Sequence, residues 1–140
     1  MAKETCLCID LRSAAQKLTQ AYDAAMAPAE ISVTQFSQMH LIRSLDGPTL
    51  KEMAAASDLD RSTLGRTLRV LEKQGLVVMK TGSDARTKTI HLTRKGLNRF
   101  KRAVPLWLGV QTTLLERLGL EGRAQFDEML DTLTAPVVQA

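Results

Sequence analysis

The sequence predicts a mainly α-helical fold with one small β-hairpin, and three observations support that prediction. Apolar residues recur at three- and four-residue steps along most of the 140-residue chain, as on one face of an amphipathic helix. Between residues 76 and 92 this period is lost, and two short apolar runs flank a polar loop. The apolar content of 44% includes only 4% aromatic residues, which favours helix over strand.

Start and stop signals delimit the first two helices. A helix is expected over Ile9–Met26, and Pro28 ends it because proline cannot continue a helix. The next helix begins after Ser32, which is spaced from Gln35 as in a capping box. Gly47-Pro48 stops this second helix.

Two short helices joined by a tight turn follow. Thr49 opens a helix over Leu50–Ala56, with a Glu three residues on that completes a capping-box pattern. Asp60 is a good N-cap for a helix over about Arg61–Gln74, which a glycine ends. Two helices arranged in this way form a helix-turn-helix.

A hairpin and a long helix complete the chain. Leu76–Met79 and Thr89–Leu92 are expected to be strands joined by an extended basic tip. Thr93 caps a long helix, which Pro105 should kink or split. A hairpin directly after a helix-turn-helix is a wing, so the predicted fold is a winged helix-turn-helix.

The chain is expected to be a single unit over residues 1–140, with its winged lobe at 32–95. The segments 5–27 and 96–140 carry more apolar helix surface than so small a lobe can bury. We therefore expect N- and C-terminal dimerisation helices and a two-fold homodimer.

Charge is spread unevenly along the chain. Residues 61–102 contain twelve Lys or Arg and two acidic residues, a net charge of +10, whereas the remainder has seven basic and thirteen acidic residues, a net charge of −6. A basic block within an acidic chain indicates a polyanionic partner at one face. The alternative is an ordinary solvated helix face.

The second helix of the motif can present its polar side to double-stranded DNA. Leu64, Leu68 and Leu71 mark its buried side, so its cations face outward into a major groove. Arg66 is the first choice for base reading, because arginine can pair bidentately with guanine. The alternative is a surface helix with cations in its last turn. The expected DNA-binding residues are Thr49, Arg61, Ser62, Thr63, Arg66, Arg69, Lys73, Lys80, Arg86 and Lys88.

The tip of the wing adds an arginine and an acid. Arg86 is expected to enter a narrow minor groove, where the negative potential is strongest. Phosphate would repel Asp84, so we expect this carboxylate to orient Arg86 or an arginine of the recognition helix. The alternative is a solvated acid that favours turn geometry.

Residues 50–96 resemble the MarR family of bacterial regulators. The shared pattern is Leu71-Glu72 before Gly75-Leu76-Val77, Asp84-x-Arg86 in the wing, and Leu92-Thr93 before Gly96. The resemblance implies an obligate dimer built by the first helix and the last two. It also implies that the helix with Arg66 enters the major groove and that Arg86 enters the minor groove. Lys80 stands close to a position where the family commonly has an arginine, and is expected to take over its phosphate contact.

Cys6 and Cys8 stand at the entrance of the first helix, where a thiol can become a reactive thiolate. The organic-hydroperoxide regulator branch of the family has a peroxide-sensing Cys at this place and a Tyr further along the helix, as Cys8 and Tyr22 are here. That branch has another Tyr near the start of the second helix, where this chain has Val33 and Phe36. Redox sensing by Cys8 is one hypothesis. Inert buried thiols and soft-metal binding are the alternatives.

The resemblance also implies a small aromatic or phenolic effector between the dimerisation helices and the DNA-binding lobe. Such a ligand, or oxidation, would favour a dimer whose recognition helices no longer match the operator. Ordinary core or surface roles are the alternative for each residue of the candidate pocket. These residues are Tyr22, Met39, His40, Arg43 and Trp107.

Several classes of protein are not expected. No apolar run approaches the ~20 residues that cross a bilayer, so we expect a cytoplasmic protein with no membrane partner. The sequence has no nucleotide-binding glycine loop, metal-ligand cluster or paired nucleophile and base, so we expect no enzyme, cofactor or metal. The favoured function is a homodimeric transcription regulator, a repressor, on a pseudo-palindromic operator. The alternative is a non-specific architectural or RNA-binding winged helix protein.

Overall fold

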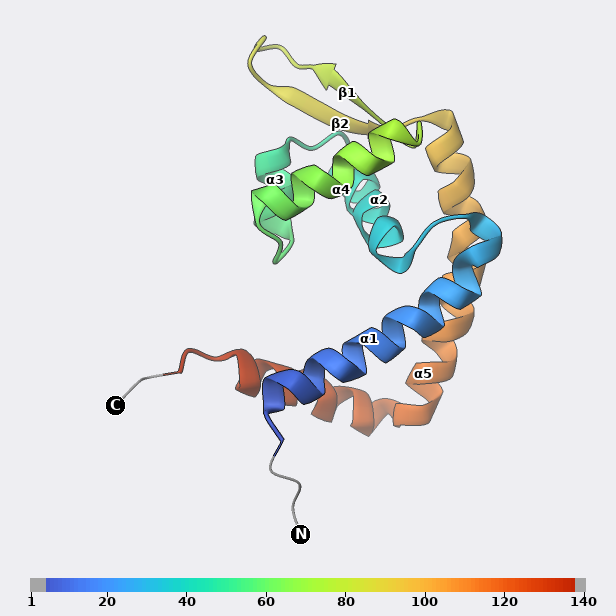
Figure 1. Cartoon of the computed structure of the whole chain (residues 1–140), viewed down its shortest axis with the longest axis vertical. Helices are drawn as coiled ribbons and strands as arrows, with labels where there is room; N and C mark the ends of the chain where they lie inside the picture. The colour runs from blue at the N-terminus through green and yellow to red at the C-terminus, as the bar shows by residue number, and fades with distance from the viewer. Residues whose placement is uncertain (1–4, 138–140) are drawn as a thin grey trace. The chain divides into compact units, whose positions relative to one another are not determined.

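The computed structural model describes residues 5–137, which form helices and one antiparallel hairpin (Figure 1). This mainly α fold confirms the prediction, and the predicted elements up to the hairpin lie within two residues of the observed ones. The chain divides into two compact units, Met1–Trp107 and Leu108–Ala140. In chain order the elements are α1 (Leu7–Met26), η1 (Ala27–Ala29), α2 (Val33–Leu45), α3 (Leu50–Ala56), α4 (Arg61–Lys73), β1 (Val77–Thr81), β2 (Lys88–Leu92) and α5 (Arg94–Thr134).

The start of α2 has the predicted capping box. The hydroxyl of Ser32 accepts the backbone N–H of Gln35 at 3.1 Å, and the Ser32 N–H donates to Gln35 Oε1 at 3.0 Å. At α3, Thr49 Oγ1 accepts the backbone N–H of Glu52 at 3.1 Å, which is one half of the predicted box. These side chains satisfy N–H groups that the first helical turn leaves unpaired.

The core of the first unit lies where α2, α3, α4, the hairpin and the beginning of α5 meet. Leu64, Leu68 and Leu71 form the fully buried side of α4, as predicted. Val77 and Ile90 bury the base of the hairpin against this core. Apolar burial therefore fixes one side of α4 and leaves its other side to solvent.

The backbone of Leu76, just before β1, contacts both the end of α4 and the start of α5. Gly75 has a positive φ of 73°, which lets α4 end and the chain turn. The Leu76 N–H donates to Leu71 O at 2.9 Å, and the Leu76 carbonyl accepts the Thr93 N–H at 3.0 Å. Gly96 lies so close to this carbonyl that a Cβ at position 96 would clash with it.

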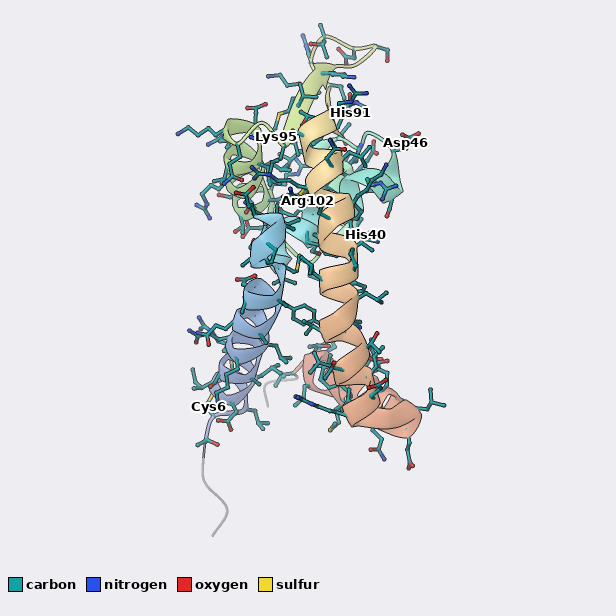
Figure 2. The ribbon with its side chains drawn as sticks, turned by 90° about the vertical axis from the view of Figure 1, so that its right-hand side faces the viewer. Cys6, His40, Asp46, His91, Lys95 and Arg102 are labelled. Atoms are coloured by element: carbon teal, nitrogen blue, oxygen red, sulfur yellow. The ribbon has the colours of Figure 1, made fainter. Side chains whose placement is uncertain are left out.

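The base of the hairpin is tied to the link between α2 and α3. Val77 pairs with Leu92 and Thr81 with Lys88, and the N–H of Ile90 donates to the carbonyl of Pro48 at 2.8 Å. The ring of His91 packs directly against Gly47, close to Asp46 (Figure 2). The hairpin is therefore held at its base, while its tip projects beyond α3 and α4 (Figure 1).

The break inside α5 lies at Gly119, so the helix is not split at Pro105, where a kink or a split was expected. Gly119 has φ 70° and ψ 172°, which is non-helical, whereas Pro105 lies within the helix. Glycine reaches positive φ without the steric cost that a Cβ brings. The break therefore falls in the second unit.

Each unit, taken by itself, leaves apolar helix surface exposed. In the first unit α1 exposes Leu7, Ile9, Leu11 and Leu18. In the second unit the exposed large side chains include Leu115, Leu118, Phe126, Met129 and Leu133. Among the described residues, no helix combines the length and apolarity that a membrane crossing needs.

Gly96→Ala should destabilise the first unit, because the added methyl group meets the backbone of Leu76 and must displace β1 or α5. Overpacking of this kind costs about 1–3 kcal/mol, so the midpoint of thermal unfolding, followed by circular dichroism, should fall by several degrees.

Gly65→Ala is the matched control, since a Cβ at Gly65 in α4 meets no atom within 4 Å. Alanine is favoured over glycine inside helices by roughly 0.5–1 kcal/mol, so this variant should be at least as stable as the wild type. If Gly96→Ala unfolds at the same temperature as Gly65→Ala, the close approach at Leu76 does not exist.

Candidate nucleic-acid interface

Asp60 sets where α4 begins. Its Oδ1 accepts the backbone N–H of Thr63 at 2.7 Å. This bond from the Thr63 backbone lowers the pKa of Asp60 below its usual value, helped by the Thr63 hydroxyl and the positive charge of Arg66. An ionised carboxylate at this place also complements the positive end of the helix dipole. The cap therefore fixes the first turn of α4, which carries Ser62 and Thr63.

The side of α4 opposite its leucines is polar and open to solvent. Arg61, Ser62, Arg66, Arg69 and Lys73 are exposed, and Thr63 is half-buried. The guanidinium of Arg66 lies against Thr63, with its Nη2 3.4 Å from Thr63 Oγ1. These predicted DNA-binding side chains therefore lie on the side of α4 that faces solvent.

The tip of the wing is a set of turns built on Asp84. Its side-chain Oδ1 accepts the backbone N–H of Arg86 at 3.0 Å, and its carbonyl accepts the N–H of Thr87 at 2.9 Å. Gly82 N–H donates to Thr87 O at 2.7 Å and closes the loop. Among the described residues no ion pair involves Asp84, so Asp84 positions the backbone of Arg86 as a turn acid.

Cations of α4 and of the wing line one groove, with a volume of roughly 690 Å³. Arg69 comes from α4, and Arg86 and Lys88 come from the wing. Figure 1 shows α3, α4 and the hairpin at the same end of the first unit. The groove also contains Thr49 and one acid, Glu72. This geometry places basic side chains from two separate elements where one polyanion can meet both.

Lys51 also lines this groove, and the sequence reasoning missed it. It lies in the first turn of α3, just after the N-cap Thr49. A positive charge is unfavourable at a helix N-terminus because of the helix dipole, and that conflict was the signal available in the sequence. Six other predicted residues lie on the first unit but do not line the groove: the half-buried Thr63 and the exposed Arg61, Ser62, Arg66, Lys73 and Lys80.

The basic block does not form a single face. Arg99 and Arg102 lie 3.4 and 3.8 Å from the carboxylate of Glu30. Lys95 Nζ donates to the carbonyl of Gln74, at the C-terminal end of α4, at 2.9 Å. These three cations line a second pocket along α5 (Lys95 and Arg102 in Figure 2). The positive charge of this segment is therefore divided between the groove and the packing of α5.

Cys6 and Cys8 are exposed and unbridged. Cys6 is the N-cap residue of α1 and Cys8 lies in its first turn. Figure 2 shows Cys6 at the end of α1 that is remote from the hairpin. In the single chain the side chains of Cys6 and Cys8 are exposed to solvent, so neither thiol is part of the core of the first unit. Among residues 5–137 no group of three or more His, Cys, Asp or Glu side chains could hold a metal ion.

The predicted effector residues lie around a stack of aromatic rings. The Phe36 ring lies 4.9 Å from that of Phe100 and 5.5 Å from that of Trp107. The guanidinium carbon of Arg43 is 5.0 Å from the centre of the Phe100 ring, and the His40 ring is 6.3 Å from it. The other two predicted residues belong to the packing of this unit: Met39 is fully buried, and Tyr22 is half-buried against the core.

The chain is similar to known regulators in both sequence and fold. A sequence model of the MarR family matches residues 31–88. The crystal structure of the Mycobacterium tuberculosis transcriptional regulator MosR in complex with DNA is 42% identical in sequence and superposes with a TM-score of 0.78. The match covers 89% of this chain and 92% of MosR.

Curated relatives give a shorter match. An HTH-type transcriptional regulator of Bacillus cereus is 32% identical over 87 residues, which is 62% of this chain but only 58% of that protein's length. The organic hydroperoxide resistance transcriptional regulator of Bacillus subtilis is 29% identical over 107 residues, which cover 76% of this chain and 73% of the relative.

Asp60→Ala should lower the thermal midpoint at neutral pH, because α4 loses its cap. The pKa of Asp60 is lower in the folded protein, so its stabilisation is complete above the unfolded value of about 4 and is lost as the pH falls through the folded value. The difference in midpoint between wild type and Asp60→Ala, measured by circular dichroism, should therefore shrink on acidification.

Asp60→Asn is the control that separates charge from capping, since asparagine also accepts a hydrogen bond at an N-cap. Its midpoint should lie between those of wild type and Asp60→Ala at neutral pH. A gap between wild type and Asp60→Ala that stays constant down to about pH 3 would show that the Asp60 carboxylate is not engaged.

Proposed function

The chain belongs to the MarR family of transcriptional regulators, and on that premise we propose that it is a homodimer that represses transcription from one specific double-stranded DNA operator. The observation that carries the proposal is the groove shared by Arg69 of α4 and by Arg86 and Lys88 of the wing. Phosphate contacts from such cations supply affinity, while base contacts supply specificity.

In the proposed complex the first turns of α4 enter the major groove. Ser62, Thr63 and Arg66 stand there on the solvent side, and Arg66 is the residue proposed to read a guanine. Arg86 at the tip of the wing enters the adjacent minor groove. A phosphate contact is also proposed for Thr49, the N-cap of α3. The remaining predicted cations are proposed to contact phosphates as well: Arg61, Arg69, Lys73, Lys80 and Lys88.

A dimer is proposed because both units leave apolar helix surface uncovered. Leu11 and Leu18 on α1, and Leu115, Leu118 and Phe126 in the second unit, are exposed in the single chain. Covering these faces in a two-fold dimer, through residues 5–27 and 96–140, presents two recognition helices. The matching operator is a pseudo-palindrome with half-sites about one helical turn apart.

Oxidation of Cys8 is one proposed control of DNA release. The Bacillus subtilis relative is named for organic hydroperoxide resistance, and Cys8 is exposed near the start of α1. An organic hydroperoxide would transfer one oxygen to the thiolate sulfur, so that the O–O bond breaks and a sulfenic acid and an alcohol form. The end of α1 is joined to α2 through Asp23 Oδ1, which accepts the Val33 N–H at 2.8 Å, so a change in α1 can bias the lobe.

A small aromatic acid or phenol is the second proposed control. Its site would be beside the Phe36–Phe100–Trp107 stack, where Arg43 supplies a cation for a carboxylate. Such a ligand acts only if it binds more tightly to a dimer whose recognition helices are wrongly spaced for the operator.

Arg66→Ala and Arg86→Ala should each weaken operator binding by roughly 1–3 kcal/mol, the usual loss for a good groove contact. The measurement is fluorescence anisotropy of labelled operator DNA at one fixed salt concentration, since affinity depends steeply on salt. Lys101→Ala removes an exposed cation of α5 that is not assigned to DNA and should bind as the wild type does. Unchanged affinity in both arginine variants, or equal wild-type affinity for operator and random DNA, would refute the proposal.

Cumene hydroperoxide should release wild-type protein from operator DNA and leave Cys8→Ser bound, because serine cannot form a sulfenic acid. Release is followed in a gel-shift titration, and mass spectrometry locates the added oxygen. Cys6→Ser serves as the matched variant at the neighbouring exposed thiol and tests whether Cys8 suffices. Equal release from wild type and Cys8→Ser would eliminate control by this thiol.

A further inference from the structure

Gln38 of α2 is buried although its amide has no partner. The residue is 4% exposed, and neither Oε1 nor Nε2 makes a hydrogen bond among the described residues. Proteins rarely bury an amide unpaired, because the group loses its hydrogen bonds to water and gains none in return. Gln38 thus destabilises the fold that contains it, which is typical of residues that serve binding.

Gln38 lines a pocket of roughly 550 Å³ between α2 and the turn that joins α3 to α4. We call this the α2–turn pocket. Its volume lies within the range of small-molecule sites. It shares no residue with the basic groove, and His40, labelled in Figure 2, is its only residue from the predicted effector set.

The lining of the pocket favours an uncharged ligand with a ring. Leu41, Leu59 and Leu64 supply apolar walls. Asp58 lines the pocket, and no Lys or Arg does, so an anion is repelled there. A carboxamide carries a donor and an acceptor side by side. A second amide edge satisfies both through two hydrogen bonds once Gln38 rotates to present them.

We propose that the α2–turn pocket binds a small uncharged molecule with an apolar ring and a carboxamide or lactam edge that pairs with the amide of Gln38. Two effects make the free energy of binding favourable: the apolar ring is buried, and the otherwise unpaired amide of Gln38 gains hydrogen bonds.

A ligand in this pocket contacts the first turn of α4 and the turn that precedes it. Leu64 is the first buried residue of α4, and Asp58 and Leu59 belong to the turn before its cap. An occupant therefore changes how α4 rests on α2 and alters operator affinity. This effect on DNA rests on the proposed function, whereas ligand binding itself does not.

Benzamide is the probe, and benzoate is its anionic counterpart of nearly the same shape. Nitrogen–proton correlation spectra of the full chain should show saturable benzamide shifts at the Gln38 side-chain NH₂ group and at the Thr34, Ala56 and Leu59 amides. A dissociation constant of about 1 mM is ordinary for a ligand of this size. Benzoate should leave these signals in place.

Gln38→Leu should weaken the benzamide response at least about tenfold. Its thermal midpoint should rise, because the unpaired amide is replaced by an apolar group, and that rise shows that the variant is folded. Gln125→Leu, a change at an exposed glutamine of the second unit, should respond to benzamide as the wild type does.

No shift up to about 20 mM benzamide would overturn the site and leave ordered water as the partner of Gln38. Equal titration of wild type and Gln38→Leu, or equal shifts with benzoate, would overturn it as well. If benzamide binds saturably but operator affinity does not change, only the proposed effect on α4 is refuted and the binding site stands. A free protein that fails to bind any operator would refute the proposed function and leave the pocket intact.

Discussion

The backbone of α5 presses on the carbonyl of Leu76 at Gly96, and the placement of both basic elements depends on this contact. The backbone N–H of Leu76 donates to the carbonyl of Leu71 at the end of α4, and the Leu76 carbonyl accepts the N–H of Thr93 just before α5. The end of α4, the start of β1 and the start of α5 are thereby held together at Leu76. The hydrogen bond from the Ile90 N–H to the Pro48 carbonyl holds the other strand, β2. These bonds hold the base of the hairpin against the α2–α3 link and the end of α4, and Arg86 and Lys88 of the wing line the same groove as Arg69.

Features coded by local chemistry could be predicted from the sequence. The N-caps at Ser32, Thr49 and Asp60 act within three residues, and Gly75 supplies the positive φ that ends α4. These signals need no tertiary context, so the elements, the buried side of α4 and the wing followed from them. The exposure of the recognition-helix cations followed as well, because a helix buried on one side must expose the other.

Features that depend on packing could not be predicted. Both Pro105 and Gly119 are helix breakers by type, and residue type alone did not show that the helical φ/ψ of α5 is interrupted at Gly119 and not at Pro105. The clustering of cations in the sequence did not show that Lys95 and Arg99 hold α5 in place. Gln38 was passed over because it stands beside the apolar stripe of α2, and only the fold buries it under the turn before α4. Buried polar groups are the hardest to foresee, since their cost depends on neighbours distant in sequence.

Selection of bound DNA from a random double-stranded pool by the full chain tests most directly whether two copies of α4 read one operator. We expect enrichment of one pseudo-palindrome with two half-sites about one helical turn apart, since a two-fold pair presents two copies of α4. Enrichment of a single isolated half-site, or a bound pool as random as the input, would contradict it.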